Sequence, residues 1–289
     1  ANYCLVEPMD ILAINDPLLG SIAVWVEELE EQDNFSWKVT GKEIPPGVAG
    51  SGNAQGITNN PINRAADPGS VNPPLIFQPP LELSGTNQVW IAASGGDGTT
   101  CNKNWGGCYV YVSTDGTTYQ QIGEIIDPCR QGVLTATLDT YGGTNPDTAH
   151  TLSLNMLMRE GELQSASADD AARAVTLAYV DGELLSYESA TLTGAHQYDL
   201  DNLYRGLYSS PISSHAVGAP FARLDASVFK YDIPADYDGV VVYFKFQSYN
   251  IWGNAVQNLA DCVEYTYTPE YIPPPDLILD GGNANGDLL

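Results

Sequence analysis

The sequence predicts an all-β protein, made of several small antiparallel β-sandwich or barrel modules that a Pro/Gly-rich linker joins. Short apolar runs alternate with polar residues at the two-residue period of a half-buried strand, and Asp-Gly and Asn-Pro turns separate them. No stretch carries the 3.6-residue period of a long amphipathic helix. No apolar run reaches the 18 residues of a membrane-spanning helix, and no signal peptide is visible.

The charge balance argues against two classes of partner. The 289 residues include 11 Lys and Arg against 36 Asp and Glu, a formal net charge of −25. Nucleic-acid binding needs cations that displace counterions from phosphates, and docking on an anionic membrane also needs them. The charge therefore favours a soluble protein from an acidic or salty setting, or a component of a crowded assembly.

Residues 1–48 are expected to be the end of a β-domain. Trp37 and Val39 are expected to face inward from the last of its strands, which are predicted over 11–14, 21–29 and 36–42. So few strands do not bury a face on their own, so this module needs partners from outside. The chain also begins without Met, which favours a piece of something longer.

A linker is expected over residues 49–80, because its prolines are incompatible with helix and with most central strands. A β-sandwich unit is expected at 81–165, where Asp115-Gly116 signals a hairpin. Its strands are predicted over 88–93, 108–113, 119–126, 134–138 and 151–158.

Residues 166–268 are expected to form a β-meander and a fibronectin-like closing hairpin. Ser167 is predicted to cap a helical turn, and Asp181-Gly182 is the strongest hairpin signal of the chain. The predicted strands cover 175–180, 183–191, 198–203, 240–248 and 262–268. Residues 269–289 are expected to be an extended tail or a linker.

Carboxylates of the meander were considered as a hydrolytic pair. Glu183 and Glu188 lie five residues apart on one predicted strand, so their side chains point to opposite faces and do not flank one glycosidic bond. A pair of Glu183 with Asp201 from a neighbouring strand stays open, although carboxylates at strand ends are usually solvated. No catalytic residue is therefore predicted.

Histidines and the tail offer little for a metal. His196 and His215 have no ligand partner at hairpin or helical spacing, which makes them isolated residues in this interpretation. Residues 280–287 resemble a calcium loop but have no downstream bidentate glutamate. We predict no metal and no cofactor.

Arg205 is one of few cations in a very acidic chain. Its fork of donors suits a structural tie that joins carboxylates and backbone carbonyls across strands. Ligand binding by this arginine is the alternative.

Aromatic residues suggest a contact surface. Trp105, Tyr109, Tyr111 and Tyr119 lie on or near one predicted hairpin, and aromatic faces beside polar side chains suit sugar rings. The alternative is that they fill the core of a β-sandwich.

The five cysteines are an odd number. Cys101 and Cys108 flank a Gly-rich loop, where a disulfide is geometrically reasonable, and Cys129 is an alternative partner for either. No CxxC pair occurs, which disfavours structural zinc.

Three stretches resemble the C-terminal region of the large tail-tip hub proteins of siphophage-like tails and gene transfer agents. The first runs from residue 180 to 225, and the second, from EPMD to PPGV, resembles the closing strands of the hub β-domain, with Met9 where Gly is usual. The third joins QVWIAASGG to WGGCYVYVSTDGTTYQQIG. In the first stretch the matching residues are Gly182-Glu183, Tyr198 to Leu200, Leu203, Arg205-Gly206, His215, Gly218, Phe221 and Leu224-Asp225.

The resemblance implies a structural protein of a virion tail tip or baseplate hub. Such a protein is a homotrimer of all-β modules that closes the tail tube, contacts other tail and baseplate proteins, and meets a host envelope receptor or polysaccharide. Assembly in the host cytoplasm implies reduced cysteines. No catalytic residue is carried over. The alternative function is a carbohydrate-binding module protein or a secreted glycan-acting enzyme.

Overall fold

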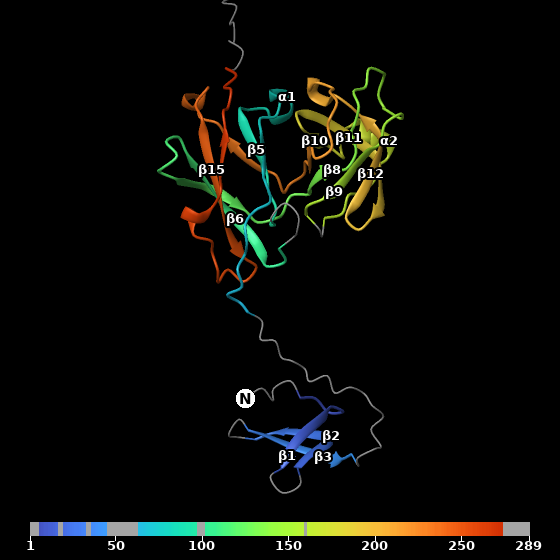
Figure 1. Cartoon of the computed structure of the whole chain (residues 1–289), viewed down its shortest axis with the longest axis vertical. Helices are drawn as coiled ribbons and strands as arrows, with labels where there is room; N and C mark the ends of the chain where they lie inside the picture. The colour runs from blue at the N-terminus through green and yellow to red at the C-terminus, as the bar shows by residue number, and fades with distance from the viewer. Residues whose placement is uncertain are drawn as a thin grey trace, which may run out of the picture. The chain divides into compact units, whose positions relative to one another are not determined.

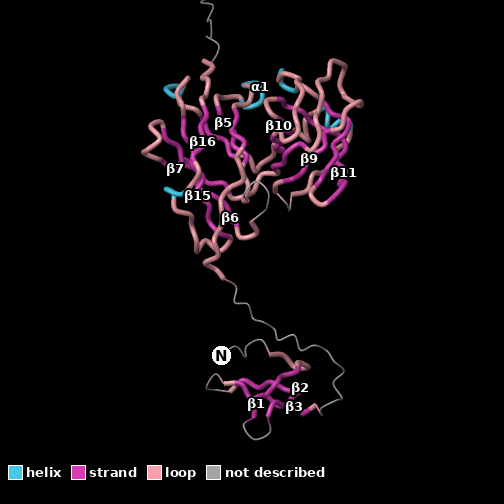
Figure 2. Tube along the Cα trace, viewed as in Figure 1, coloured by secondary structure: helices cyan, strands magenta, loops and turns pink. Residues whose placement is uncertain are grey.

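The computed structural model describes residues 6–16, 20–32, 36–44, 63–96, 102–158 and 161–273 (Figure 1). The chain divides into two compact units, Ala1–Ile62 and Asn63–Leu289. Strands dominate both units, and the helices are short (Figure 2). The all-β class predicted from the sequence is confirmed.

The first unit is one antiparallel sheet in the order β1-β2-β3. Its strands are β1 (Ile11–Asp16), β2 (Gly20–Glu31) and β3 (Trp37–Glu43). Val24 and Val26 of β2 are buried, whereas every residue of β3 is exposed. The expectation that Trp37 and Val39 face inward is wrong, because they are 45% and 39% exposed and the described residues of this unit form a single layer.

One half of the second unit is a β-sandwich. A sheet in the order β14-β5-β4 faces a sheet in the order β16-β15-β6-β7. Their inward side chains form one apolar core, to which Ile91, Val110 and Phe244 belong. The strands are β4 (Leu75–Phe77), β5 (Gln88–Ala92), β6 (Trp105–Ser113), β7 (Gln120–Ile125), β14 (Phe229–Asp232), β15 (Val242–Asn250) and β16 (Glu264–Tyr267). Helix α1 (Leu81–Ser84) joins β4 to β5.

The other half is a closed six-stranded barrel in the order β10-β11-β12-β9-β8-β13. Leucines, Met156 and Phe221 fill its interior, because alternate residues of each strand point inward. Its strands are β8 (Gln131–Leu134), β9 (Leu152–Met156), β10 (Ala178–Val180), β11 (Glu183–Gly194), β12 (Gln197–Tyr204) and β13 (Pro220–Arg223). Helix α2 (Ala168–Ala172) lies against β11.

The barrel and the sandwich share an apolar contact. Leu184 and Ala222 from the barrel pack in one cluster with Phe77 and Trp90 from the sandwich. Phe77 also stacks on Tyr179, with ring centroids 4.0 Å apart. The outer face of the barrel is therefore buried on this side.

Strand pairing does not follow the domain boundaries expected from the sequence. No boundary lies at residue 165, because β9 pairs with β12 and β15 pairs with β6 across it. The linker expected at 49–80 is wrong in its described part, because β4 pairs with β5 and Val71 is buried. The predicted domains group strands that are close in the sequence, whereas these strands pair with partners that are distant along the chain.

Local predictions were more successful. Val180 pairs with Glu183, and Asp181 and Gly182 both have positive φ, as a two-residue type I′ turn requires. The Ser167 side chain accepts a hydrogen bond from the Asp170 N–H at the start of α2. Within the described ranges, no helix is long and apolar enough to cross a membrane.

Candidate functional site

A buried ionic cluster occupies one end of the barrel. Glu183 is the first residue of β11, directly after the Asp181-Gly182 turn, and Arg205 directly follows β12. The β11–β12 pairing brings the two together, although 22 residues separate them. Both side chains are fully buried. The cluster is defined here as Glu183, Arg205, His215 and Asp147.

Arg205 holds Glu183 through one edge of its guanidinium, the edge formed by Nε and Nη2. Nε donates to Glu183 Oε1 at 2.6 Å and Nη2 donates to Oε2 at 2.8 Å. This bidentate geometry is the strongest that a carboxylate and an arginine form. The Gly206 N–H also donates to Glu183 Oε1, at 3.1 Å.

The remaining donors of Arg205 reach three further segments. Nη1 donates to the Asp139 carbonyl at 3.2 Å and to Asp147 Oδ2 at 3.5 Å, while Nη2 donates to the Ser213 carbonyl at 3.1 Å. The Asn145 side chain bonds to the Arg205 backbone twice: its Nδ2 donates to the Arg205 carbonyl, and its Oδ1 accepts from the Arg205 N–H, each at 2.9 Å. Every guanidinium nitrogen is therefore bonded, and four chain segments meet at one residue.

His215 and Asp147 complete the cluster. His215 Nε2 lies 2.8 Å from Glu183 Oε2, and its backbone pairs with Leu138. Asp147 pairs with Leu203 through the backbone, and its carboxylate accepts hydrogen bonds from the N–H groups of Ala149 and His150. The interpretation of His215 as isolated is wrong, because the fold brings it to Glu183.

The electrostatics of Glu183 favour the ionised form. Burial pushes its pKa up, but hydrogen bonds from Arg205 and His215, the charge of Arg205 and the Gly206 N–H outweigh burial and lower the pKa below its ordinary value. The side chains of Glu183, Arg205 and His215 are all 0% exposed. The expectation of a solvated carboxylate is wrong here, because both oxygens of this carboxylate are buried and bonded to Arg205, Gly206 and His215.

The other polar residues singled out in the meander lie apart from the cluster. Asp201 accepts a hydrogen bond from Thr151 at 2.6 Å, and Glu188 accepts one from Asn202 at 3.1 Å. His196 lies in the turn between β11 and β12, with φ of 63°. These contacts join neighbouring strands and assemble no acid–base pair.

The aromatic residues separate into buried and half-buried ones. Trp105 is buried, at 8% exposed, and its indole donates to Ser248 at 3.1 Å. Tyr109, Tyr111 and Tyr119 are half-buried. Trp105 therefore belongs to the sandwich core, and the expectation that it contributes to a surface is wrong.

Each of the three tyrosines contacts a neighbour on the sheet. The Tyr109 ring lies 5.1 Å from the Tyr249 ring, and the Tyr111 hydroxyl donates to Gln247 at 3.1 Å. The Tyr119 hydroxyl donates to Glu264, and burial together with this hydrogen bond raises the pKa of Tyr119. This outer face of β6 and β15 remains the candidate contact surface.

Three cysteines lie in the described part of the chain. Cys108, Cys129 and Cys262 are buried free thiols, so no disulfide of Cys108 or Cys129 forms; burial raises the pKa of Cys129 to about 12. In the same ranges, no group of three His, Cys, Asp or Glu side chains could hold a metal ion. Cys101 and the calcium-like stretch 280–287 lie outside the described residues.

Sequence analysis missed Asn145 and Asp147, which sit in a loop between β8 and β9. Asn and Asp in a Gly/Pro-rich loop signal only local turn bonds. No local pattern indicates that this loop reaches Arg205, because Asn145 precedes the arginine by 60 residues.

Comparison with known proteins gives one partial match. The family model described as "Rcc01698-like, C-terminal" matches residues 129–222, about a third of the chain. This is the name of a gene-transfer-agent or phage-associated family, and it fits loosely with the resemblance seen in the sequence. No curated protein matches the chain. The matched range runs from just before β8 to within β13, so it covers the barrel and its ionic cluster.

Proposed function

We propose that the chain is a structural component of the tail tip or baseplate hub of a phage or phage-like particle. The observation that carries this proposal is the coincidence of the family match, residues 129–222, with the barrel, from just before β8 to within β13. The barrel is a closed, self-contained core, which suits a module of a large assembly.

The chemistry of the barrel supports a structural function over a catalytic one. The carboxylate of Glu183 is ionised, paired with Arg205 and fully buried. A general acid or base must reach a substrate, whereas a buried and fully bonded pair fixes the strands that carry it.

The same proposal includes assembly as a homotrimer at the tail tip. There the chain contacts other tail and baseplate proteins and faces a host envelope receptor or polysaccharide. The first unit supports it with exposed apolar side chains such as Ile11, Trp25 and Trp37, which are 60%, 43% and 45% exposed. Ile11 and Trp25 are partners across β1 and β2, and contiguous exposed apolar side chains mark a surface that contacts another protein. The free thiols of Cys108 and Cys129 agree with assembly in a reducing host cytoplasm.

Two measurements test the proposal. Size-exclusion chromatography with light scattering on the full chain is expected to give a trimer or a larger assembly. Antibodies raised against the chain are expected to label one end of purified tailed particles in electron micrographs. A monomer that binds and hydrolyses a glycan, with no labelling of particles, would contradict the tail-tip function.

Carbohydrate binding is the second candidate function, and the outer face of β6 favours it. Tyr109 and Tyr111 are half-buried there beside Gln247, and aromatic rings with amide groups suit sugars. Tyr119 is less available, because Lys245 Nζ lies 4.8 Å from the centre of its ring. Binding to a glycan array that Tyr109→Ala and Tyr111→Ala abolish would support this function.

A further inference from the structure

The end of the barrel opposite the ionic cluster is open. Glu183, Leu185 and Tyr187 alternate along β11, and the last two belong to the barrel core. Glu183 and Tyr187 therefore lie on the same inner face, about 13 Å apart along the strand. Phe221 and Arg223 alternate in the same way along β13, which places Arg223 near Tyr187.

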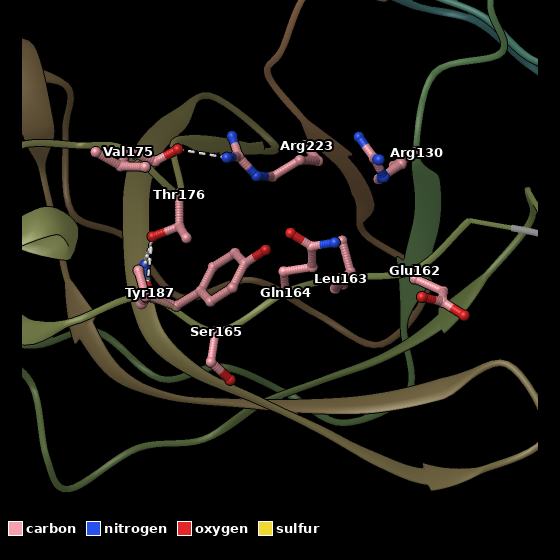
Figure 3. A pocket seen from close by; sticks show the side chains of 10 residues that line it. Arg130, Glu162, Leu163, Gln164, Ser165, Val175, Thr176, Tyr187 and Arg223 are labelled. Carbon is pink, nitrogen blue, oxygen red and sulfur yellow. Dashed lines mark hydrogen bonds between the residues drawn. The ribbon is translucent and has the colours of Figure 1, made fainter.

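A pocket of about 130 Å³ lies at this open end, which we call the barrel mouth (Figure 3). That volume holds about four water molecules at roughly 30 Å³ each. Its lining comes from β11, β13, the residues before β8 and β10, and the segment before α2. The lining residues are Arg130, Glu162, Leu163, Gln164, Ser165, Ala166, Val175, Thr176, Tyr187 and Arg223.

Tyr187 has an unused hydroxyl at the base of this pocket. The residue is 0% exposed, and its Oη lies beside the Arg223 guanidinium but makes no hydrogen bond of normal geometry in the described part of the chain. Arg223 can only donate, so the Tyr187 O–H has no acceptor there. Figure 3 shows the hydroxyl pointing into the space that Gln164 and Arg223 border. A buried hydroxyl without a partner costs free energy, and a ligand oxygen in the pocket would supply the missing acceptor.

Two arginines line the same pocket in a chain that has only 11 Lys and Arg residues. Arg223 donates to the carbonyls of Val175, Leu177 and Leu224, which leaves its charge without a carboxylate partner within the described ranges. Arg130 is paired with Asp225, and Glu162 lies on the exposed side of the pocket. Arg223 is therefore the cation of the pocket that backbone carbonyls hold in place and that no carboxylate of the described residues neutralises.

We propose that the barrel mouth binds an oxyanion group of the size of a carboxylate or a phosphate. The Tyr187 hydroxyl donates to one oxygen of the group, and the guanidinium group of Arg223 provides the positive field. The net charge of −25 repels anions from the surface as a whole, so saturable anion binding must come from a local site. This inference does not depend on the tail-tip function.

The experiment measures binding of inorganic phosphate and, separately, of acetate to the full chain by calorimetry at pH 7 and constant ionic strength. Wild-type protein is expected to bind at least one of the two in a saturable manner, and the ion that binds identifies the group. Tyr187→Phe removes only the hydroxyl and is expected to weaken binding about tenfold. Arg223→Lys is expected to weaken it further, because lysine loses the planar fork.

Arg173→Gln is the matched control, because Arg173 is exposed at the end of α2 and does not line the pocket. It removes one positive charge and is expected to leave binding unchanged. The proposal is overturned if neither ion binds. It is also overturned if Tyr187→Phe and Arg223→Lys bind as tightly as wild type.

Discussion

The two ends of the barrel carry charged residues in opposite circumstances. At one end Arg205 and His215 are fully buried and bonded to Glu183, and His215 Nδ1 is the atom of this group without a partner in the described structure. At the other end Arg223 borders a pocket, and the Tyr187 hydroxyl has no acceptor in the described structure. The difference teaches that the same strand, β11, contributes a structural lock at its start and an unsatisfied donor four residues later.

The buried end is expected to dominate stability. Arg205→Ala leaves the carboxylates of Glu183 and Asp147 buried without the arginine that pairs with both, so the free energy of unfolding should fall by about 3–5 kcal/mol. Urea denaturation of the full chain followed by circular dichroism measures this change. Arg173→Ala, on the exposed surface, should change it by no more than about 0.5 kcal/mol. Equal urea midpoints for Arg205→Ala and Arg173→Ala would contradict a stabilising function of the ionic cluster.

Glu183→Gln tests the same end through pH. The pKa of Glu183 is lowered in the folded state, so its contribution is complete above the ordinary glutamate pKa of about 4.3 and is lost as the pH falls further. The free energy of unfolding of the wild type should exceed that of Glu183→Gln by about 2–4 kcal/mol at pH 7, and this difference should become smaller below about pH 4. Unfolding curves between pH 3 and 7 measure it.

Asp225 also titrates with a lowered pKa, so its contribution must be separated from that of Glu183. Burial raises its pKa, but hydrogen bonds from Ser227 and the charge of Arg130 outweigh burial and lower it. Wild type and Glu183→Gln share this residue, so it cancels in their difference. A gap that stays constant down to pH 3 would show that Glu183 is not the group that titrates.

The open end is expected to affect stability least. Tyr187→Phe removes a hydroxyl that has no partner in the described chain, so in phosphate-free buffer the free energy of unfolding should stay within about 1 kcal/mol of wild type or rise slightly. Thermal unfolding measures it. A loss of more than about 2 kcal/mol would mean that the hydroxyl is bonded within the protein.

Short-range patterns in the sequence predicted local structure well. The Asp181-Gly182 turn and the Ser167 cap depend on neighbouring residues alone, and both form. The alternation of Tyr109 and Tyr111 with Val110 and Val112 predicted a strand, which is β6, but left open which of its faces is buried. The alternation of polar and apolar residues and the residue types of a turn depend on a few consecutive residues, so they can be read from the sequence.

Long-range pairing could not be predicted in the same way. His215 reaches Glu183 across 32 residues, and β15 joins β6 across more than a hundred. Glu183 was expected to be solvated because a strand end is usually exposed, and the convergence of Arg205 and His215 overrides that tendency. The pocket at the barrel mouth escaped prediction for the same reason, since Arg130, Tyr187 and Arg223 come from three strands or strand ends.

One titration tests the contrast between the two ends most directly: urea midpoints of wild type, Glu183→Gln and Tyr187→Phe, each with and without the anion, phosphate or acetate, that binds the wild type, at constant ionic strength. Glu183→Gln should have a lower midpoint than wild type and should still gain stability from the anion. Tyr187→Phe should match wild type without the anion and lose most of the gain with it. An unchanged midpoint for Glu183→Gln, with a full anion-dependent gain for Tyr187→Phe, would contradict the account at both ends.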